Sequence, residues 1–352
     1  MARKVLHKPD TTKILGRLLG CILAAGLFIV AAPIWMTEAA ASPPAYTTSW
    51  YMDTANPASI PAAGYALGCA LGTHDLKTAG AQKDVVILFF GMPAYSNATY
   101  GTYDWSSPGN PNNQVFVSSA QIAETVEQFG AGYYICTGKD RTSQLHIAAG
   151  VNNAGSDETY DQGVAWATMT MNISAWVTAQ GYSSQVSVRA AGDMEPDMNS
   201  PSATQAWVDG YTSVYNSNSP ASSGLYLYNV GSASGCPLAG PYTASTVCGN
   251  SWTAEGVWYV SWGTLALFPF PEIYNTVGAN GTQWSLISQY GRITAESGAL
   301  SFMGALTQSQ ACKQMGGCSG INDTPAKGWT NLWKNVKATQ SSLYGSTDLK
   351  WK

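Results

Sequence analysis

The sequence predicts an α/β protein, a single-domain (β/α)8 TIM-barrel-like fold with disulfide-closed loops. Apolar, strand-like runs alternate with helix-like segments between residues 81 and 345, and the runs number eight. No Gly-x-Gly-x-x-Gly motif follows the first run, whereas a nucleotide-binding open sheet would carry one there. A doubly wound open sheet is the alternative architecture.

Residues 1–41 have the composition of a secretory signal peptide. Basic residues from Arg3 to Arg17 precede an apolar stretch at 18–35, and Ala39-Ala40-Ala41 resembles a small-residue cleavage site. The apolar stretch is nearly long enough to cross a bilayer, so an uncleaved anchor is the alternative. We therefore expect a secreted, extracellular protein that meets the membrane only through this segment.

Eight apolar runs are expected to form strands. The run at 84–90 is continuously apolar, as in a strand buried on both faces, and it ends at Gly91. The other expected strands cover 132–136, 145–151, 185–195, 224–229, 256–262, 283–290 and 299–306.

The segments between these runs have helical signals. At 118–129, Ser118 or Ser119 would cap a helix that places Ile122, Val126 and Phe129 on one face. Further helices are expected at 158–180, at 202–216 and at 324–339. Residues 42–80 precede the first expected strand, and we expect them to be an extension that packs across the bottom of the barrel.

The cysteine count indicates disulfides. Of seven cysteines, Cys21 falls in the leader and six remain in the exported chain. An even number in an exported protein favours pairing, although six cysteines allow 15 connectivities. Proximity favours three pairs: Cys236 with Cys248, Cys312 with Cys318, and Cys69 with Cys136.

The composition narrows the classes of partner. Charged residues make up 11% of the chain and the net charge is −4, with no basic cluster after the leader, which argues against nucleic acid. The exported part has no Cys-x-x-Cys pair and only two histidines, so no metal and no cofactor are expected. Most of the 13 Trp and 19 Tyr should pack in the core of a monomer.

Two carboxylates at the end of the expected strand 185–195 are the strongest functional signal. Asp193 and Glu195 are two residues apart, so in a strand they would face one side. Pro196 should end the strand, because proline cannot donate to a sheet ladder. In a barrel the pair would lie at the C-terminal mouth, where a glycosidase holds two carboxyl groups.

Other polar and aromatic residues fall at or near expected strand ends and are candidates for sugar binding. They are Asn152, with Asn153 beside it, Tyr228, Asn229, Trp262, Gln289 and Tyr290. Amides would bind sugar hydroxyls, and aromatic faces would stack on the ring. Each also has a structural interpretation, since Asn often forms turns and Trp262 could be a core residue. Likewise, Arg189 shares the face of the two acids and could be their buried partner.

Several of these segments resemble known families. Asp193-Met194-Glu195-Pro196 resembles the Asp-x-Glu signature of family-25, lysozyme-type glycoside hydrolases, and 283–290 with 298–307 resembles their last strands. The motif Ala190-Ala-Gly-Asp-Met-Glu-Pro196, with 207–211 and 304–318, is also similar to an uncharacterised family of secreted actinobacterial proteins.

The resemblance implies a secreted hydrolase of cell-wall or environmental polysaccharide, with Glu195 as general acid and Asp193 as the stabilising carboxylate. Lysozyme-type members carry further acids on the first and last strands, but this chain has none at 89–93 or at 304–307. Asp197 could replace one of them. The alternative is a non-catalytic carbohydrate- or wall-binding protein on a degenerate glycosidase barrel.

Overall fold

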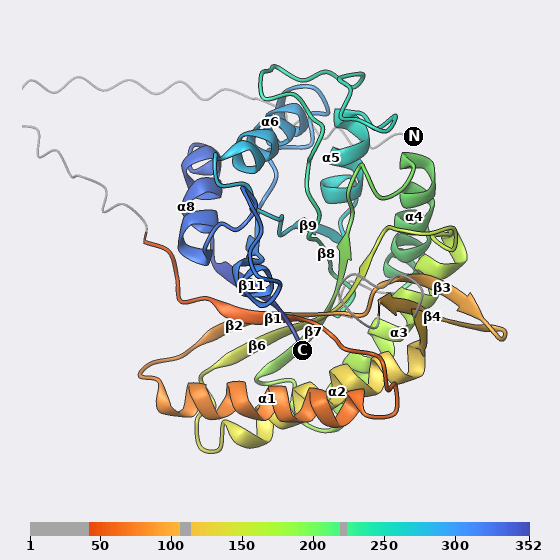
Figure 1. Ribbon diagram of the computed structural model, residues 1–352, viewed down its shortest axis with the longest axis vertical. Coiled ribbons are helices and arrows are strands. Elements are labelled where there is room, and N and C mark those ends of the chain that lie inside the picture. Colours follow the sequence, from red (N-terminus) through yellow and green to blue (C-terminus); the bar gives the residue numbers. More distant parts are fainter. Residues whose placement is uncertain (1–41, 106–113, 219–223) are drawn as a thin grey trace, which may run out of the picture. The chain divides into compact units, whose positions relative to one another are not determined.

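The computed structural model describes residues 42–105, 114–218 and 224–352. Residues 1–41, and with them the expected signal peptide, lie outside the described part. Eight parallel strands follow one another around a single sheet (Figure 1): β1 (Thr47–Tyr51), β2 (Lys83–Phe89), β6 (Gln144–Asn152), β7 (Val186–Asp193), β8 (Leu227–Asn229), β9 (Leu267–Pro269), β10 (Gly304–Thr307) and β11 (Gly345–Trp351).

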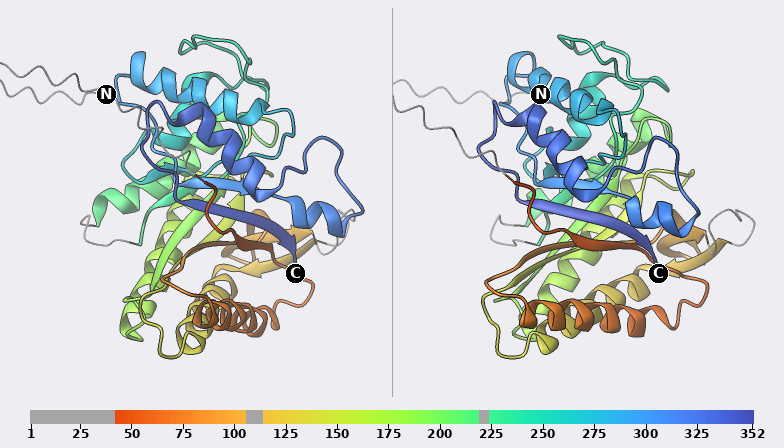
Figure 2. Two further views of the ribbon diagram at one scale, coloured as in Figure 1. Left: turned by 90° about the vertical axis from the view of Figure 1, so that its left-hand side faces the viewer. Right: turned by 60° about the vertical axis from the view of Figure 1, so that its left-hand side comes forward.

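The sheet nearly closes on itself between β9 and β10. The amide of Met303 donates to the carbonyl of Pro269 at 2.9 Å, and the amide of Leu306 donates to that of Pro271 at 2.9 Å. Glu272 pairs with Leu306 in a parallel bridge. The first and last strands of the chain are also joined, because β11 pairs with β1 in parallel, and the two lie side by side in Figure 2. The predicted (β/α)8 barrel is confirmed.

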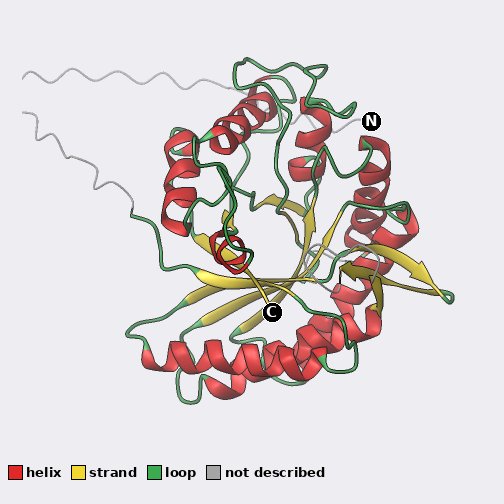
Figure 3. Cartoon of the chain, viewed as in Figure 1, coloured by secondary structure: helices red, strands yellow, loops and turns green. Residues whose placement is uncertain are grey.

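Helices surround the strands on the outside (Figure 3). They are α1 (Ile60–Lys77), α2 (Ser119–Cys136), α3 (Tyr160–Ala179), α4 (Pro201–Ser217), α5 (Ala254–Trp262), α6 (Ala279–Ile293), α7 (Ser309–Gln314) and α8 (Pro325–Val336). A three-stranded antiparallel sheet of β3 (Met92–Ser96), β4 (Thr99–Trp105) and β5 (Gln114–Ser118) lies between β2 and α2 along the chain.

The segment 42–80 is part of the barrel and not an extension beneath it. It supplies β1, which pairs with both β2 and β11, and helix α1. The barrel also runs past residue 345, because β11 continues to Trp351. The expected boundary at 81 is therefore wrong. Its cause is that Thr47–Tyr51 is short, carries hydroxyls inside the sheet and lacks the apolar run of a buried strand.

Three expected strands are helical. Residues 132–136 extend α2, 256–262 lie in α5, and 283–290 lie in α6. In α6 the buried side chains Trp284, Ile287 and Ser288 recur at helical spacing, so this error could have been avoided from the sequence. The strands expected at 84–90, 145–151, 185–195 and 224–229 are confirmed within a few residues, and 299–306 overlaps β10 at residues 304–306.

Close contact between α1 and α2 explains why 132–136 is helical. A Cβ on Gly68 would lie 2.0 Å from the carbonyl oxygen of Phe129, and one on Gly132 would lie 2.3 Å from that of Tyr65. Glycine on both helices lets their backbones approach, and burial of Tyr133 then outweighs the strand propensity of Gly-Tyr-Tyr-Ile. The disulfide Cys69–Cys136 joins the same two helices.

The other two expected disulfides are present as well. Cys236–Cys248 closes a loop after β8, and Cys312–Cys318 closes one after β10. Within the residues described, no helix is long and apolar enough to span a bilayer.

Two apolar clusters fill the protein. The larger lies between the sheet and the helices, and it includes Val86, Leu88 and Trp166. The smaller fills the inside of the barrel and includes Ile87, Phe89, Ala148, Ala191, Tyr228, Phe270, Leu306 and Leu349. Alternate residues of each strand therefore face the barrel interior, and this parity decides which polar side chains meet at its two ends.

Candidate active site

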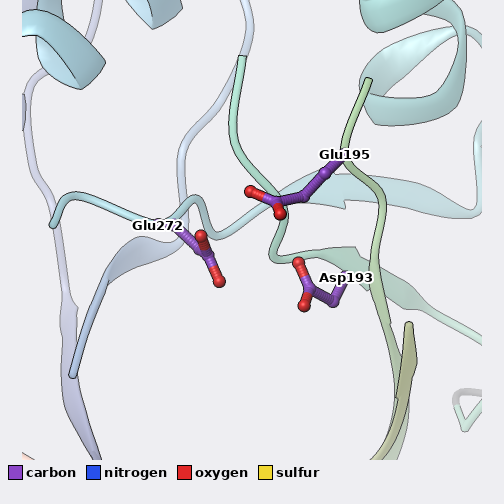
Figure 4. A group of neighbouring side chains, drawn as sticks. All are labelled: Asp193, Glu195 and Glu272. Carbon is purple, nitrogen blue, oxygen red and sulfur yellow. The ribbon is translucent and has the colours of Figure 1, made fainter. Parts of the chain in front are cut away.

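Three carboxyl groups meet at the C-terminal end of the barrel. Asp193 is the last residue of β7, Glu195 follows two residues later, and Glu272 follows β9. One oxygen from each lies within 4.8 Å of the others, and Figure 4 shows all three side chains pointing toward one space. The prediction that Asp193 and Glu195 face the same space holds, and β7 is the fourth strand of the barrel, as expected.

The backbone of Glu195 is held by the neighbouring strand. Its amide donates to Oδ1 of Asn153 at 3.1 Å, and Nδ2 of Asn153 donates to the Glu195 carbonyl at 3.1 Å. The same Nδ2 also donates to Oγ1 of Thr204, which in turn donates to Glu158. Asn153 is thus a positioning residue, and its buried amide fixes where the Glu195 side chain starts.

The loop after β8 approaches Glu195 from the other side. A Cβ on Gly231 would lie 2.2 Å from the carbonyl oxygen of Met194, so only glycine allows this approach. The next residue, Ser232, is buried, and hydrogen bonding by its hydroxyl and its backbone amide counteracts the rise that burial causes in the pKa of Glu195. These donors favour one orientation of the carboxylate.

Glu272 was missed in the sequence. It follows Phe268-Pro-Phe-Pro271. Strand β9 has only three residues, and prolines in and after it argue against a strand in the sequence. Its amide donates to the Gly231 carbonyl at 3.3 Å, so the loop that supports Glu195 also supports Glu272. An acid directly after a short apolar run, 266–273, was the available signal.

Two tyrosines line the acid cluster, and neither was predicted. The pKa of Tyr51 and that of Tyr274 are raised well above the usual value, first by burial and then by the Glu272 charge. Tyr51 ends β1 and stacks on Trp351 at 4.4 Å between ring centroids. Both therefore stay protonated, and they place aromatic surface beside the carboxyl groups.

Burial and mutual repulsion favour protons on these acids. Burial raises the pKa of Asp193 well above its usual range, and the Glu195 and Asp197 charges raise it further. Glu272 shifts upward for the same reasons, with Asp193 the largest charge acting on it. Burial raises the pKa of Glu195 as well, while the Ser232 and Glu272 hydrogen bonds partly offset that rise. Three like charges at this spacing cannot all be ionised, so the cluster holds acid and carboxylate side by side.

The three acids differ in their exposure to solvent. Asp193 is 7% exposed and Glu272 6%, whereas Glu195 is only half-buried. Glu195 is therefore the acid that a bound molecule can reach. The oxygen atoms are also close enough to contact one cation together, and an oxygen-only set suits Ca²⁺ or Mg²⁺ rather than zinc.

Arg189 is not the partner of the two acids. It lies four residues before Asp193 on β7, which separates their Cα atoms by about 13 Å along a strand. Its guanidinium lies 5.3 Å from the Tyr226 ring centroid, toward the opposite end of the barrel. The proposed buried ion pair is wrong, and none of the charges that shift Asp193, Glu195 or Glu272 is a cation.

Most of the expected sugar-binding residues do not lie at the site. Asn152 is close to it, since it pairs with Asp193 in the sheet, but its Oδ1 accepts from the Ala154 amide. Asn229 is fully buried and holds the β8 loop through the Gly231 amide and the Ser261 hydroxyl. Both side chains thus have structural partners.

The four remaining candidates lie elsewhere. Tyr228 faces the barrel interior and contacts His146. Trp262 is the last residue of α5, and Gln289 and Tyr290 belong to α6, where Tyr290 packs on Trp258. For Trp262, Gln289 and Tyr290 the reason is the incorrect strand assignment, which placed helical residues at strand ends.

The further acids of lysozyme-type enzymes must be sought at other positions than expected, because the barrel begins one strand earlier. The first barrel strand is β1, so the segment at 89–93 follows the second strand. Asp53 follows β1, but it is exposed and its Oδ1 accepts from the Ala55 amide. On the last strand, Asp348 is buried and accepts from the Ser309 amide and the Thr307 hydroxyl. Neither acid joins the three-acid cluster.

The sequence matches no known family and no curated protein, so the resemblances drawn above stay predictions. Among solved structures, the chain is similar to a sugar phosphate isomerase/epimerase from Parabacteroides distasonis, with 10% identity, 89% of this chain and 90% of that chain covered, and a TM-score of 0.41. It is also similar to a GH18 chitinase from Pseudoalteromonas aurantia, with 11% identity, 88% and 94% covered, and a TM-score of 0.38.

Proposed function

We propose that the protein is a secreted glycoside hydrolase of a cell-wall or environmental polysaccharide, with Glu195 as general acid. The observation that supports this most is the convergence of Asp193, Glu195 and Glu272 within 4.8 Å at the C-terminal end of a (β/α)8 barrel. Glycosidic cleavage needs a protonated carboxyl group next to an ionised one, and burial with mutual repulsion supplies both.

Access and charge suggest the division of roles. Glu195 is the half-buried acid, so it can reach the leaving oxygen and protonate it. Asp193 is more deeply buried beneath it and, once its proton has moved to Glu272, would stabilise as a carboxylate the positive charge that develops at the sugar carbon. Glu272 lies beside both acids and is the carboxylate that would take up the Asp193 proton.

The spacing favours retention of configuration. Carboxyl groups in retaining enzymes are about 5–5.5 Å apart, whereas inverting enzymes leave about 6.5–9.5 Å for a water molecule. Oxygen atoms within 4.8 Å of one another fit the first arrangement. The hydroxyls of Tyr51 and Tyr274 stay protonated and would donate to the sugar at this point.

A binding protein without hydrolysis is the second candidate. It is favoured because Asp53 and Asp348, the acids at the first and last strands, bind backbone and hydroxyl groups elsewhere and do not join the cluster.

A screen of peptidoglycan and common polysaccharides, measuring both binding and release of reducing ends, distinguishes a hydrolase from a binding protein. For a hydrolase, Glu195→Gln should lower release by at least about a hundredfold, the usual contribution of a general acid, while sugar binding is kept. Glu124→Gln is the matched control, since it makes the same change at an exposed position of helix α2. Binding without release in the native protein would support the second candidate, and unchanged release by Glu195→Gln would contradict the assignment of the acid.

A further inference from the structure

A cavity lies at the N-terminal end of the barrel, opposite the acid cluster. Its volume is about 230 Å³, and its walls come from the first residues of β2, β6 and β11, from β8 and from the segment before β10. Val85, Met303 and Tyr344 supply apolar surface, whereas Lys83, His146 and Tyr228 supply polar atoms. The cavity therefore has an apolar body and a polar side.

The polar side is basic because of the sheet register. Lys83, His146 and Arg189 lie on β2, β6 and β7, which are neighbours in the sheet (Figure 1). Val85 pairs with His146, and Ala148 pairs with Arg189. Each of the three basic residues has the parity of the interior residues Ile87, Ala148 and Ala191, so all three face into the barrel.

The interactions of His146 agree with this placement. Its Nδ1 lies 3.2 Å from the Tyr228 hydroxyl, which is itself inside the barrel. Burial, together with the Arg189 and Lys83 charges, lowers the pKa of His146 to about 4. The ring is thus neutral and can donate one hydrogen bond, within a positive potential from the two cations.

The one carboxylate on the cavity wall does not offset that potential. Asp84 has the parity of Val86 and Leu88, which pack in the layer between sheet and helices. Burial and its contact with Asp75 raise its pKa to about 9, so it is uncharged at neutral pH. The cavity then joins cationic groups to apolar walls, which is the complement of a small organic anion.

We propose that this cavity binds a small carboxylate with an apolar body, at a site separate from the acid cluster. The carboxylate would accept from the Lys83 ammonium and from the His146 ring. The Tyr228 hydroxyl, next to Nδ1 of His146, would fix the orientation of that ring. The body would lie against Val85 and Met303, with the exposed Tyr344 at the entrance. A volume of about 230 Å³ admits a ligand smaller than a drug-sized molecule.

Benzoate and benzyl alcohol test this, because they share a ring and differ in charge. In calorimetric titration benzoate should bind, with benzyl alcohol at least roughly tenfold weaker, as expected for loss of a charge-assisted hydrogen bond. Benzoate should also shift the imidazole NMR signals of His146, which a His146→Gln variant identifies. No binding of benzoate at millimolar concentration, or equal binding of the alcohol, would overturn the proposal.

Variants locate the site. Lys83→Met keeps the apolar stem of an exposed side chain and should weaken benzoate binding roughly tenfold. Val85→Phe should remove binding by filling the cavity. Lys350→Met is the matched control, because it removes the same charge from β11 near its other end, where Lys350 lies over the Trp50 ring. Equal losses for Lys83→Met and Lys350→Met would mean nonspecific charge attraction and would refute the site.

Discussion

Replacing Asp193 by Asn should stabilise the protein at neutral pH while removing its proposed activity. The Asp193 side chain is buried, its Oδ1 has no hydrogen-bond partner, and two other acids lie beside it. Ionising it in the fold is therefore unfavourable, whereas in the unfolded chain it ionises with a pKa of about 3.9. Asn has the shape of the protonated acid and carries no ionisation cost.

The sign and size of the change in the free energy of unfolding follow from proton linkage. The folded pKa is raised, so stability is fully present below the unfolded pKa and is lost as the pH rises toward the folded pKa. The loss is about 1.4 kcal/mol per pH unit. Asp193→Asn should thus be neutral near pH 4, and it should be more stable than the native protein by about 2.8 kcal/mol at pH 6.

Urea unfolding between pH 4 and pH 8, with disulfides intact, measures this difference directly. Asp53→Asn is the control, because Asp53 is exposed and lies beyond β1 at the same end of the barrel. A constant destabilisation by Asp193→Asn across the pH range would refute the reasoning, since it would mean that the ionised carboxylate is structurally paired.

Two further predictions concern stability. Glu158 is 4% exposed, and burial raises its pKa to about 8. Glu158→Gln should therefore increase the free energy of unfolding by about 3 kcal/mol at pH 7 and leave it unchanged near pH 4. Urea unfolding at the two pH values measures this, and a loss of stability at both would contradict it. Replacing Cys69 and Cys136 together by Ser should cost about 4 kcal/mol, because the disulfide closes a separation of 67 residues. An unchanged melting temperature would show that the packing of α1 on α2 suffices without it.

The fold class could be predicted because its signal is spread over many segments. Runs such as 84–90 and 145–151 are apolar at nearly every position, Asp84 and His146 excepted, which few structures other than a buried parallel strand explain. Two errors then cancelled: β1 was missed and 132–136 was counted as a strand, so β7 still came fourth. The correct strand number for Asp193 therefore owes something to chance.

The candidate site was only half predictable, and the reason is geometric. Asp193 and Glu195 are neighbours in sequence, so local spacing places them on one face. Glu272 joins them from 77 residues beyond Glu195, through the closure between β9 and β10, and no local pattern encodes that contact. Short strands between prolines carry too few residues for periodicity to identify them.

The interior of the barrel is electrically polarised, and this follows from the parity of its strands. On β7 alone, Arg189 and Asp193 face inward at opposite ends, with Ala191 between them in the apolar layer. Ile87, Phe89 and Phe270 complete that layer, so a polar group at one end cannot reach a group at the other. Asp193 thus escapes neutralisation by Arg189, the half-buried cation of its own strand. An acid kept protonated at the C-terminal end and a basic cavity at the N-terminal end are two consequences of the same arrangement.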